Sequence, residues 1–161
     1  MLNPADLVDA IVAALQDIPE FVTEMNSEPD RISAYHDQFP ARVNLGQAIY
    51  QMDPPSTLVA WRETAPGSVG RMEMWKHSFS VYFRPKEHAA GDDYGYGKLM
   101  GLFINGVPTS GTGQKLLNEP IHASCFPMDV PTFARNTLMV TQDSSIDYFE
   151  VRLTLTEMGD Q

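Results

Sequence analysis

The segment 106–115, GVPTSGTGQK, is the stretch of the chain that comes nearest to a phosphate-binding loop. Such a loop needs lysine directly after its second glycine, then serine or threonine, and a strand leading into it. Here Thr112 follows Gly111, Lys115 comes three positions late, and a helical pattern precedes the loop. The segment therefore predicts a flexible loop and no nucleotide-binding site.

His122 and Cys125 have the H-x-x-C spacing that two ligands of a metal ion can have. A structural zinc site needs four ligands, and His36, His77 and His88 lie far away with no paired spacing. Folding could bring them together, but the spacing does not indicate it, so we expect no metal site. The one cysteine of the chain allows no intrachain disulfide and is expected to be a small buried residue.

The other polar residues give little support to catalysis. His77 lies between two aromatic residues on the apolar face of a strand pattern, where a hydrogen-bonded core histidine is commoner than a catalytic base. Ser68 is wrongly placed for a nucleophile elbow. Asp92 and Asp93 are interpreted as a helix cap, and no carboxylate pair lies in an apolar setting that would separate its pKa values. We expect no catalytic residue and no cofactor.

Helices are predicted at three places. Asn3 suits an N-cap and Pro4 the first helical position, and apolar residues at helical spacing follow, so we expect a helix over 4–18 that ends before Pro19. Asn44 is the expected cap of a short helix that reaches residue 52. The segment 94–108 has a second long helical pattern, although it contains several glycines. These helices would have apolar faces to bury.

Strand patterns dominate the rest of the chain. Residues 56–64 and 71–85 are predicted to form a long β-hairpin around a loop at 64–70. The second of these strands places Trp75, His77, Phe79, Val81 and Phe83 on one face. Further strands are expected at 31–37, at 137–142 and, with the clearest alternation, at 148–158; a short strand or turn is possible at 121–126.

The mixture of helices and strands does not alternate as in a parallel α/β protein. We therefore expect an α+β fold with an antiparallel-rich sheet, a long β-hairpin and two main helices packed on one face. The 161 residues fit a single domain, 1–161, with an irregular insertion at about 108–135.

The composition limits the classes of partner. A formal net charge of −10 and scattered basic residues oppose the phosphate contacts of a DNA-reading protein. The charge would serve solubility, or would keep DNA from adhering to a channel that it passes through. No apolar run approaches the ~18 residues of a membrane span, and the first residues lack a basic region, so we expect no membrane and no signal peptide.

Four segments resemble the tail terminator and head–tail joining (minor tail) proteins of tailed bacteriophages, of the lambda tail terminator type. They are NPADLVDAIVAAL, PPSTLVAWRETAPG, MWKHSFSVYFR and YFEVRLTLTEMGD. The expected order of helix, hairpin, helix and returning strand is similar as well. The resemblance covers most of the chain except 108–135, and it lies in patterning, not in a catalytic signature.

The resemblance implies a structural virion protein of the tail or neck, assembled in the host cytoplasm. Its partners would be copies of itself in a hexameric ring, the tail tube protein, and the head connector or neck protein. The ring would stop tube growth and join the head, with DNA passing through it without specific binding. The insertion at 108–135 would be an outward decoration or a contact to the connector.

The resemblance also implies contacts between subunits along the hairpin 57–84. Met72, Met74 and Tyr82 on its outer face are the candidate subunit-interface residues. Methionines such as Met52, Met72 and Met74 are, however, more often core filler. Two other functions stay open: a related neck, connector or tail tube subunit, and a small ligand-binding or enzymatic α+β domain with an apolar pocket.

Overall fold

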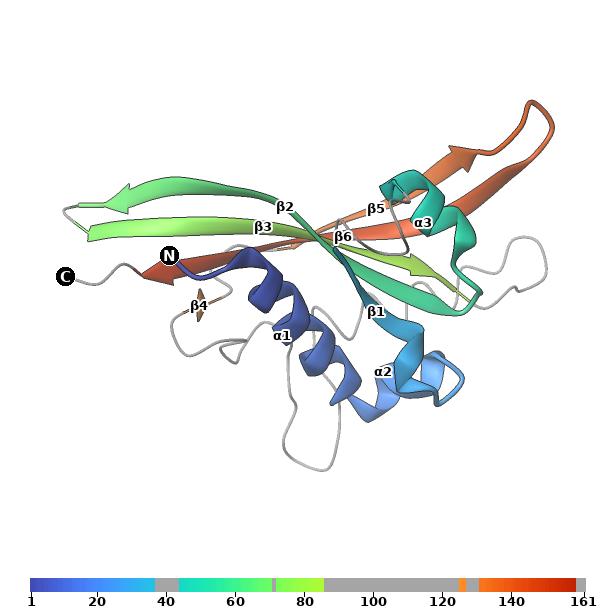
Figure 1. Ribbon diagram of the computed structural model, residues 1–161, viewed down its shortest axis with the longest axis horizontal. Coiled ribbons are helices and arrows are strands. Elements are labelled where there is room, and N and C mark those ends of the chain that lie inside the picture. The colour runs from blue at the N-terminus through green and yellow to red at the C-terminus, as the bar shows by residue number, and fades with distance from the viewer. Residues whose placement is uncertain (37–43, 71, 86–124, 127–130, 159–161) are drawn as a thin grey trace.

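A computed structural model describes residues 1–36, 44–70, 72–85, 125–126 and 131–158 of the chain (Figure 1). The helices are α1 (Pro4–Gln16), α2 (Pro19–Glu24) and α3 (Leu45–Gln51), with a 3-10 turn at Pro29–Arg31. The strands are β1 (Ile32–Tyr35), β2 (Ser56–Val69), β3 (Met72–Arg84), β4 (Cys125–Phe126), β5 (Thr132–Met139) and β6 (Ser145–Met158). The fold is α+β, as the sequence predicts. The helix expected at 94–108 lies outside the described residues.

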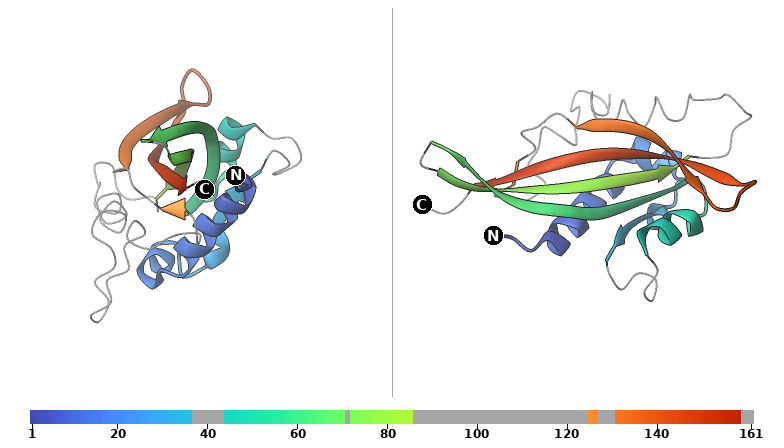
Figure 2. Two further views of the ribbon diagram at one scale, coloured as in Figure 1. Left: turned by 90° about the vertical axis from the view of Figure 1, so that its left-hand side faces the viewer. Right: turned by 90° about the horizontal axis from the view of Figure 1, so that it is seen from above.

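A six-stranded sheet organises the described part of the chain. Its strand order is β1–β2–β3–β6–β4, and β5 also pairs with β6. Among these pairs β1–β2 is parallel and the others are antiparallel, which confirms the antiparallel-rich sheet. Figures 1 and 2 show a long, twisted sheet with the β2–β3 turn at one end and the β5–β6 turn at the other.

The long hairpin is confirmed, but the loop predicted at 64–70 is wrong. β2 and β3 stay paired as far as Val69 and Met72, with a bulge between Trp61 and Glu63, and the turn is at Gly70, whose φ of 62° suits glycine. β1 pairs with β2 only at residues 57–60, so Pro66 lies where β2 has no partner on that side. Pro66 therefore does not end the strand. A proline is tolerated at a strand edge that needs no N–H.

One face of the sheet is covered by α1 and α2. Asn3 caps α1 by accepting a hydrogen bond from the Ala5 amide at 3.0 Å, as predicted. The apolar stripe of α1 and Phe21 of α2 pack on alternate residues of β3 and β6. Pro19, expected to end helical structure, instead occupies the first turn of α2, where its missing N–H costs nothing. No helix in the described ranges is long and apolar enough to cross a membrane.

Part of the opposite face is covered by α3. Asn44 caps this helix by accepting from the Gln47 amide at 2.8 Å, as predicted. Its buried residues Ala48 and Ile49 pack on Leu58 and other side chains of the sheet. Near α3 both faces of the sheet therefore carry helices. Side chains of the sheet that point away from the core under α1 and α2 are buried there as well.

The last two strands both begin earlier in the chain than predicted. β6 begins at Ser145, three residues before the expected start, and β5 begins at Thr132, inside the segment expected to be irregular. The two strands pair from Met139–Ser145 to Thr132–Arg152, and this pairing extends both of them. The resulting hairpin projects beyond α3 (Figure 1).

Candidate functional site

β2 presents an edge that no described strand covers. β1 pairs with residues 57–60 of β2, and no described strand lies beside residues 61–69 on that side. The N–H and C=O groups of such an edge can pair with another chain. The edge begins at Trp61, whose side chain is 47% exposed.

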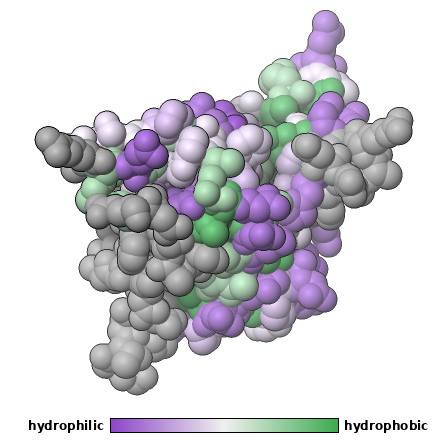
Figure 3. All heavy atoms as spheres, turned by 60° about the vertical axis from the view of Figure 1, so that its left-hand side comes forward, coloured by the Kyte–Doolittle hydropathy of each residue, from purple (hydrophilic) through white to green (hydrophobic). Residues whose placement is uncertain are grey.

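The β5–β6 tip, residues 139–144, is the second exposed feature. Met139 is 64% exposed and Val140 is 36% exposed, while the rest of the tip is polar. The turn is closed by a hydrogen bond from the Val140 amide to the Ser144 carbonyl at 2.9 Å. On the face shown in Figure 3, the described apolar side chains form small groups among hydrophilic ones. A projecting tip with apolar residues is suited to enter a recess on another molecule.

The three predicted interface residues differ in accessibility. Tyr82 is buried: its ring lies 5.9 Å from that of Tyr148, and its hydroxyl accepts a hydrogen bond from Arg62. Met74 is also buried, opposite Gly67 of β2. Met72 alone of the three keeps partial exposure. Since Tyr82 packs against α3 and Tyr148 and Met74 is buried as well, little beyond Met72 is left for a neighbour to contact.

A cluster of buried polar side chains lies on the face that α1 covers. It consists of His77 in β3, Cys125 in β4 and Glu157 in β6. Cys125 is opposite Glu157, and Glu157 is diagonal to His77 across β3 and β6, so the pleat turns all three to one side. The imidazole, thiol and carboxylate atoms lie within 4.8 Å of one another.

Sequence reasoning missed this cluster. It treated His77 as a core residue and Cys125 as a small buried one, which their complete burial confirms, but it did not bring them together. Glu157 continues the inward alternation of Leu153 and Leu155 by one further step, and a carboxylate at that step was the available signal. His122, whose H-x-x-C spacing to Cys125 two metal ligands can have, lies outside the described residues, as does His88.

Hydrogen bonds fix the orientation of the His77 ring. Nδ1 lies 2.8 Å from Oγ1 of Thr64, and Nε2 lies 2.8 Å from Oε2 of Glu157. The Trp61 indole N–H donates to the same Thr64 oxygen at 3.0 Å. Thr64 can then donate its own proton to Nδ1, which leaves the imidazole proton on Nε2, facing Glu157.

The carboxylate of Glu157 is held from a second side by the start of the chain. The Leu2 amide lies 3.0 and 2.9 Å from its two oxygens. Burial raises the pKa of Glu157, but the Leu2 amide, His77 and the N-terminal amino group outweigh burial and hold the pKa below its usual range. Glu157 is therefore an anion in a buried site.

These groups do not form a nucleophilic triad. Burial, with a smaller effect from the Glu157 carboxylate, raises the pKa of the Cys125 thiol to about 11, so the thiolate is scarce at neutral pH. Both nitrogens of His77 already bind oxygen atoms, so neither is directed at the sulfur as a general base. The cluster can instead stabilise the fold or, as nitrogen, sulfur and oxygen donors, hold a metal ion.

A second buried carboxylate, Glu150 of β6, lies on the opposite face. Ser80 donates to its Oε1 at 2.8 Å, and Arg152 lies 3.4 Å from the same oxygen. Asn136 of β5 approaches Oε2 at 3.5 Å, and Arg62 lies 3.9 Å from Oε1. These partners tie β2, β3, β5 and β6 together. Both oxygens of the carboxylate are thus in contact with polar side chains of the sheet.

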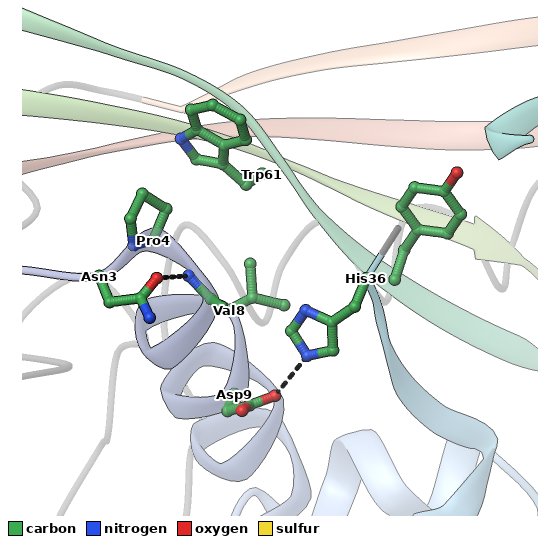
Figure 4. A pocket seen from close by; sticks show the side chains of 8 residues that line it. Asn3, Pro4, Val8, Asp9, His36 and Trp61 are labelled. Carbon is green, nitrogen blue, oxygen red and sulfur yellow. Dashed lines mark hydrogen bonds and ion pairs between the residues drawn. The ribbon is translucent and has the colours of Figure 1, made fainter. Parts of the chain in front are cut away.

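An open groove of about 600 Å³ lies between α1 and the β1–β2 edge (Figure 4). Trp61 and Val8 form apolar walls. Asp9 and His36 meet at its rim, with 3.0 Å between Oδ1 and Nε2. Among the described residues that line the groove, this carboxylate and this imidazole are therefore paired with each other.

No protein-family model matches the sequence, and no curated protein is significantly similar to it. The resemblance to phage tail proteins therefore depends on the residue patterns described above. The described residues form a sheet with an exposed β5–β6 tip, a stretch of β2 that no described strand covers, and a buried polar cluster.

Proposed function

We propose that the chain is a structural subunit that assembles with copies of itself into a ring. In this proposal the ring lies at the head-proximal end of a phage tail tube, ends tube polymerisation and presents a surface to the head. The residue patterns that resemble tail terminator proteins support the tail role. The edge of β2 at residues 61–69, beside which no described strand lies, carries the proposal of assembly.

The edge and the β5–β6 tip support a head-to-tail contact. The β2 edge is on one side of β3 in the strand order, and β6 with its partner β5 is on the other, so the two features are different surfaces of one subunit. A contact between two different surfaces repeats from copy to copy, and it forms a closed ring when the rotation per subunit allows. Trp61, at the start of the edge and in the wall of the groove, would receive the tip of the neighbour.

The proposed mechanism is steric. A ring that occupies the growing face of the tube prevents the next tube subunit from adding, and no cofactor is needed. The net charge of −10 would weaken adhesion of DNA to the ring during passage. The partners in this proposal are the tail tube protein and the head connector or neck protein.

The open groove favours a second candidate, a small ligand-binding domain. Its volume of about 600 Å³ is in the range of small-molecule sites, and Trp61 offers an aromatic surface. This function predicts a monomer that binds a small molecule in the groove and does not associate with tubes.

Light scattering on the purified chain separates the two candidates. The ring proposal predicts a particle of several 17.9-kDa subunits, six if the resemblance holds. A stable monomer at micromolar concentration would reject it. Imaging of particles that lack the protein then tests the tail role: overlong tails indicate a terminator, unjoined heads and normal tails a joining protein, and heads without tubes a tube subunit.

A further inference from the structure

Three kinds of metal-binding side chain meet inside the fold. His77 and Cys125 are fully buried, and Glu157 is 7% exposed. Their donor atoms lie within 4.8 Å of one another and come from three adjacent strands, β3, β6 and β4. Side chains on neighbouring strands of a sheet are held firmly in place, as a metal site requires.

The distances are close to those of a bound ion. Ligand atoms around a tetrahedral zinc ion lie about 3.5 Å apart, given bonds of about 2.0 to 2.3 Å. Nε2 of His77 and Oε2 of Glu157 are 2.8 Å apart and would separate slightly, while the sulfur would move inward from within 4.8 Å.

The surrounding hydrogen bonds suit such a site. Metal-binding histidines usually donate their other ring N–H to an oxygen atom, which fixes the ring and its tautomer. Thr64 provides that oxygen, 2.8 Å from Nδ1 of His77. The Leu2 amide holds the carboxylate of Glu157 in the same way. Two of the three donors are thus oriented by groups that would not themselves bind the ion.

We infer that His77 Nε2, Cys125 Sγ and the Glu157 carboxylate bind a divalent transition-metal ion of the zinc type. Imidazole, thiolate and carboxylate together favour zinc over magnesium or calcium, which prefer oxygen ligands. On binding, the thiol proton passes to solvent and the imidazole proton moves to Nδ1. One thiolate and one carboxylate then neutralise the dication, and water takes the fourth position. None of the three ligands belongs to the proposed assembly surfaces, although Thr64, which orients His77, lies on the β2 edge.

Cobalt(II) is a direct probe of this site. Cys125 is the one cysteine of the chain, so a thiolate-to-cobalt absorption band in the near ultraviolet can only come from it. The full chain, first treated with a chelator, is titrated with cobalt(II) and its metal content is measured. We expect this band to saturate at one cobalt per chain, and zinc to displace the cobalt.

Two variants and a control localise the binding. Cys125→Ser should remove the band while circular dichroism shows a folded protein. Thr64→Val, which keeps the shape but loses the oxygen at Nδ1, should weaken cobalt binding about 10- to 100-fold. His36→Gln changes an exposed histidine outside the cluster and should bind cobalt like the wild type.

Three results would overturn the inference. The first is a wild-type chain that shows no thiolate band at a tenfold excess of cobalt. The second is saturation at one cobalt per two chains, which would place the ion between subunits. The third is equal cobalt affinity in the wild type and in Thr64→Val. It would show that the Thr64 oxygen does not orient His77 for a metal ion.

Discussion

Nε2 of His77 lies 2.8 Å from Oε2 of Glu157, although 80 positions separate the two residues in the sequence. The pair connects β3 with β6 inside the core, and each partner has a further hydrogen bond, to Thr64 and to the Leu2 amide. A buried polar group that loses its partner costs more than the bond itself stabilised. Changing one member should therefore disturb the whole chain of contacts.

Glu157→Ala tests the importance of the pair for the fold. The substitution leaves the buried His77 N–H and the partly buried Leu2 amide without their acceptor. We expect the free energy of unfolding, measured with urea, to fall by about 1–3 kcal/mol. Asp143→Ala in the exposed β5–β6 turn is the control and should change it by less than about 0.5 kcal/mol. Equal effects of the two substitutions would contradict the interpretation.

Acid should weaken the same contact. The pKa of Glu157 is lowered in the folded protein by the Leu2 amide, His77 and the N-terminal amino group, which act against burial. Its stabilisation is therefore complete above the unfolded pKa of about 4.3 and is lost as the pH falls through the lower folded value. We expect the stability difference between wild type and Glu157→Gln to shrink below about pH 4.5.

Urea unfolding at a series of pH values between neutral and strongly acidic measures that difference. Asp147 also has a lowered pKa, through hydrogen bonds from Thr137 and Arg135, but it is present in both proteins and cancels in the comparison. A difference that stays constant down to pH 2 would show that the charge of Glu157 does not stabilise the fold.

Cys125 should resist alkylation in the native protein. It is fully buried, and its pKa of about 11 leaves about one thiolate in a thousand at pH 8. We expect iodoacetamide labelling, followed by mass spectrometry, to be at least about a hundred times slower than in urea. Similar native and denatured rates would mean that β4 leaves the sheet readily.

The local patterns predicted much of the fold, because they report burial on one face. The alternation in β3 and β6 and the caps Asn3 and Asn44 are found where expected. Pro19 and Pro66 misled the prediction. A proline can end a helix or begin one, and it can interrupt a strand or lie on an edge strand. Which of these applies depends on the neighbouring strand or helix, and no local pattern reports that neighbour.

The buried cluster could not be predicted from the sequence for a similar reason. His77 and Glu157 meet only because the register of β3 against β6 places them diagonally, and Cys125 joins through a two-residue strand. The burial of Tyr82 depends on α3 and Tyr148, which cover the face expected to be outer. Long-range register and helix placement decide both features, and spacing along the chain records neither.

Met139→Lys tests the proposed contact of the β5–β6 tip. Met139 is 64% exposed in the single chain, so the substitution should leave the stability of the subunit within about 0.5 kcal/mol of the wild type. In a ring the new charge would be moved from water into an apolar contact, which is unfavourable. We expect subunit affinity, measured by light scattering across a dilution series, to fall at least about tenfold.

Tyr50→Lys is the matched control for that experiment, because it also changes a largely exposed apolar residue but lies on α3 and outside both the tip and the β2 edge. It should assemble like the wild type. If both variants assemble normally, the tip does not take part in the ring, and a contact along the β2 edge alone must hold it. If both fail equally, the effect is one of added charge and the tip has no special place in the interface.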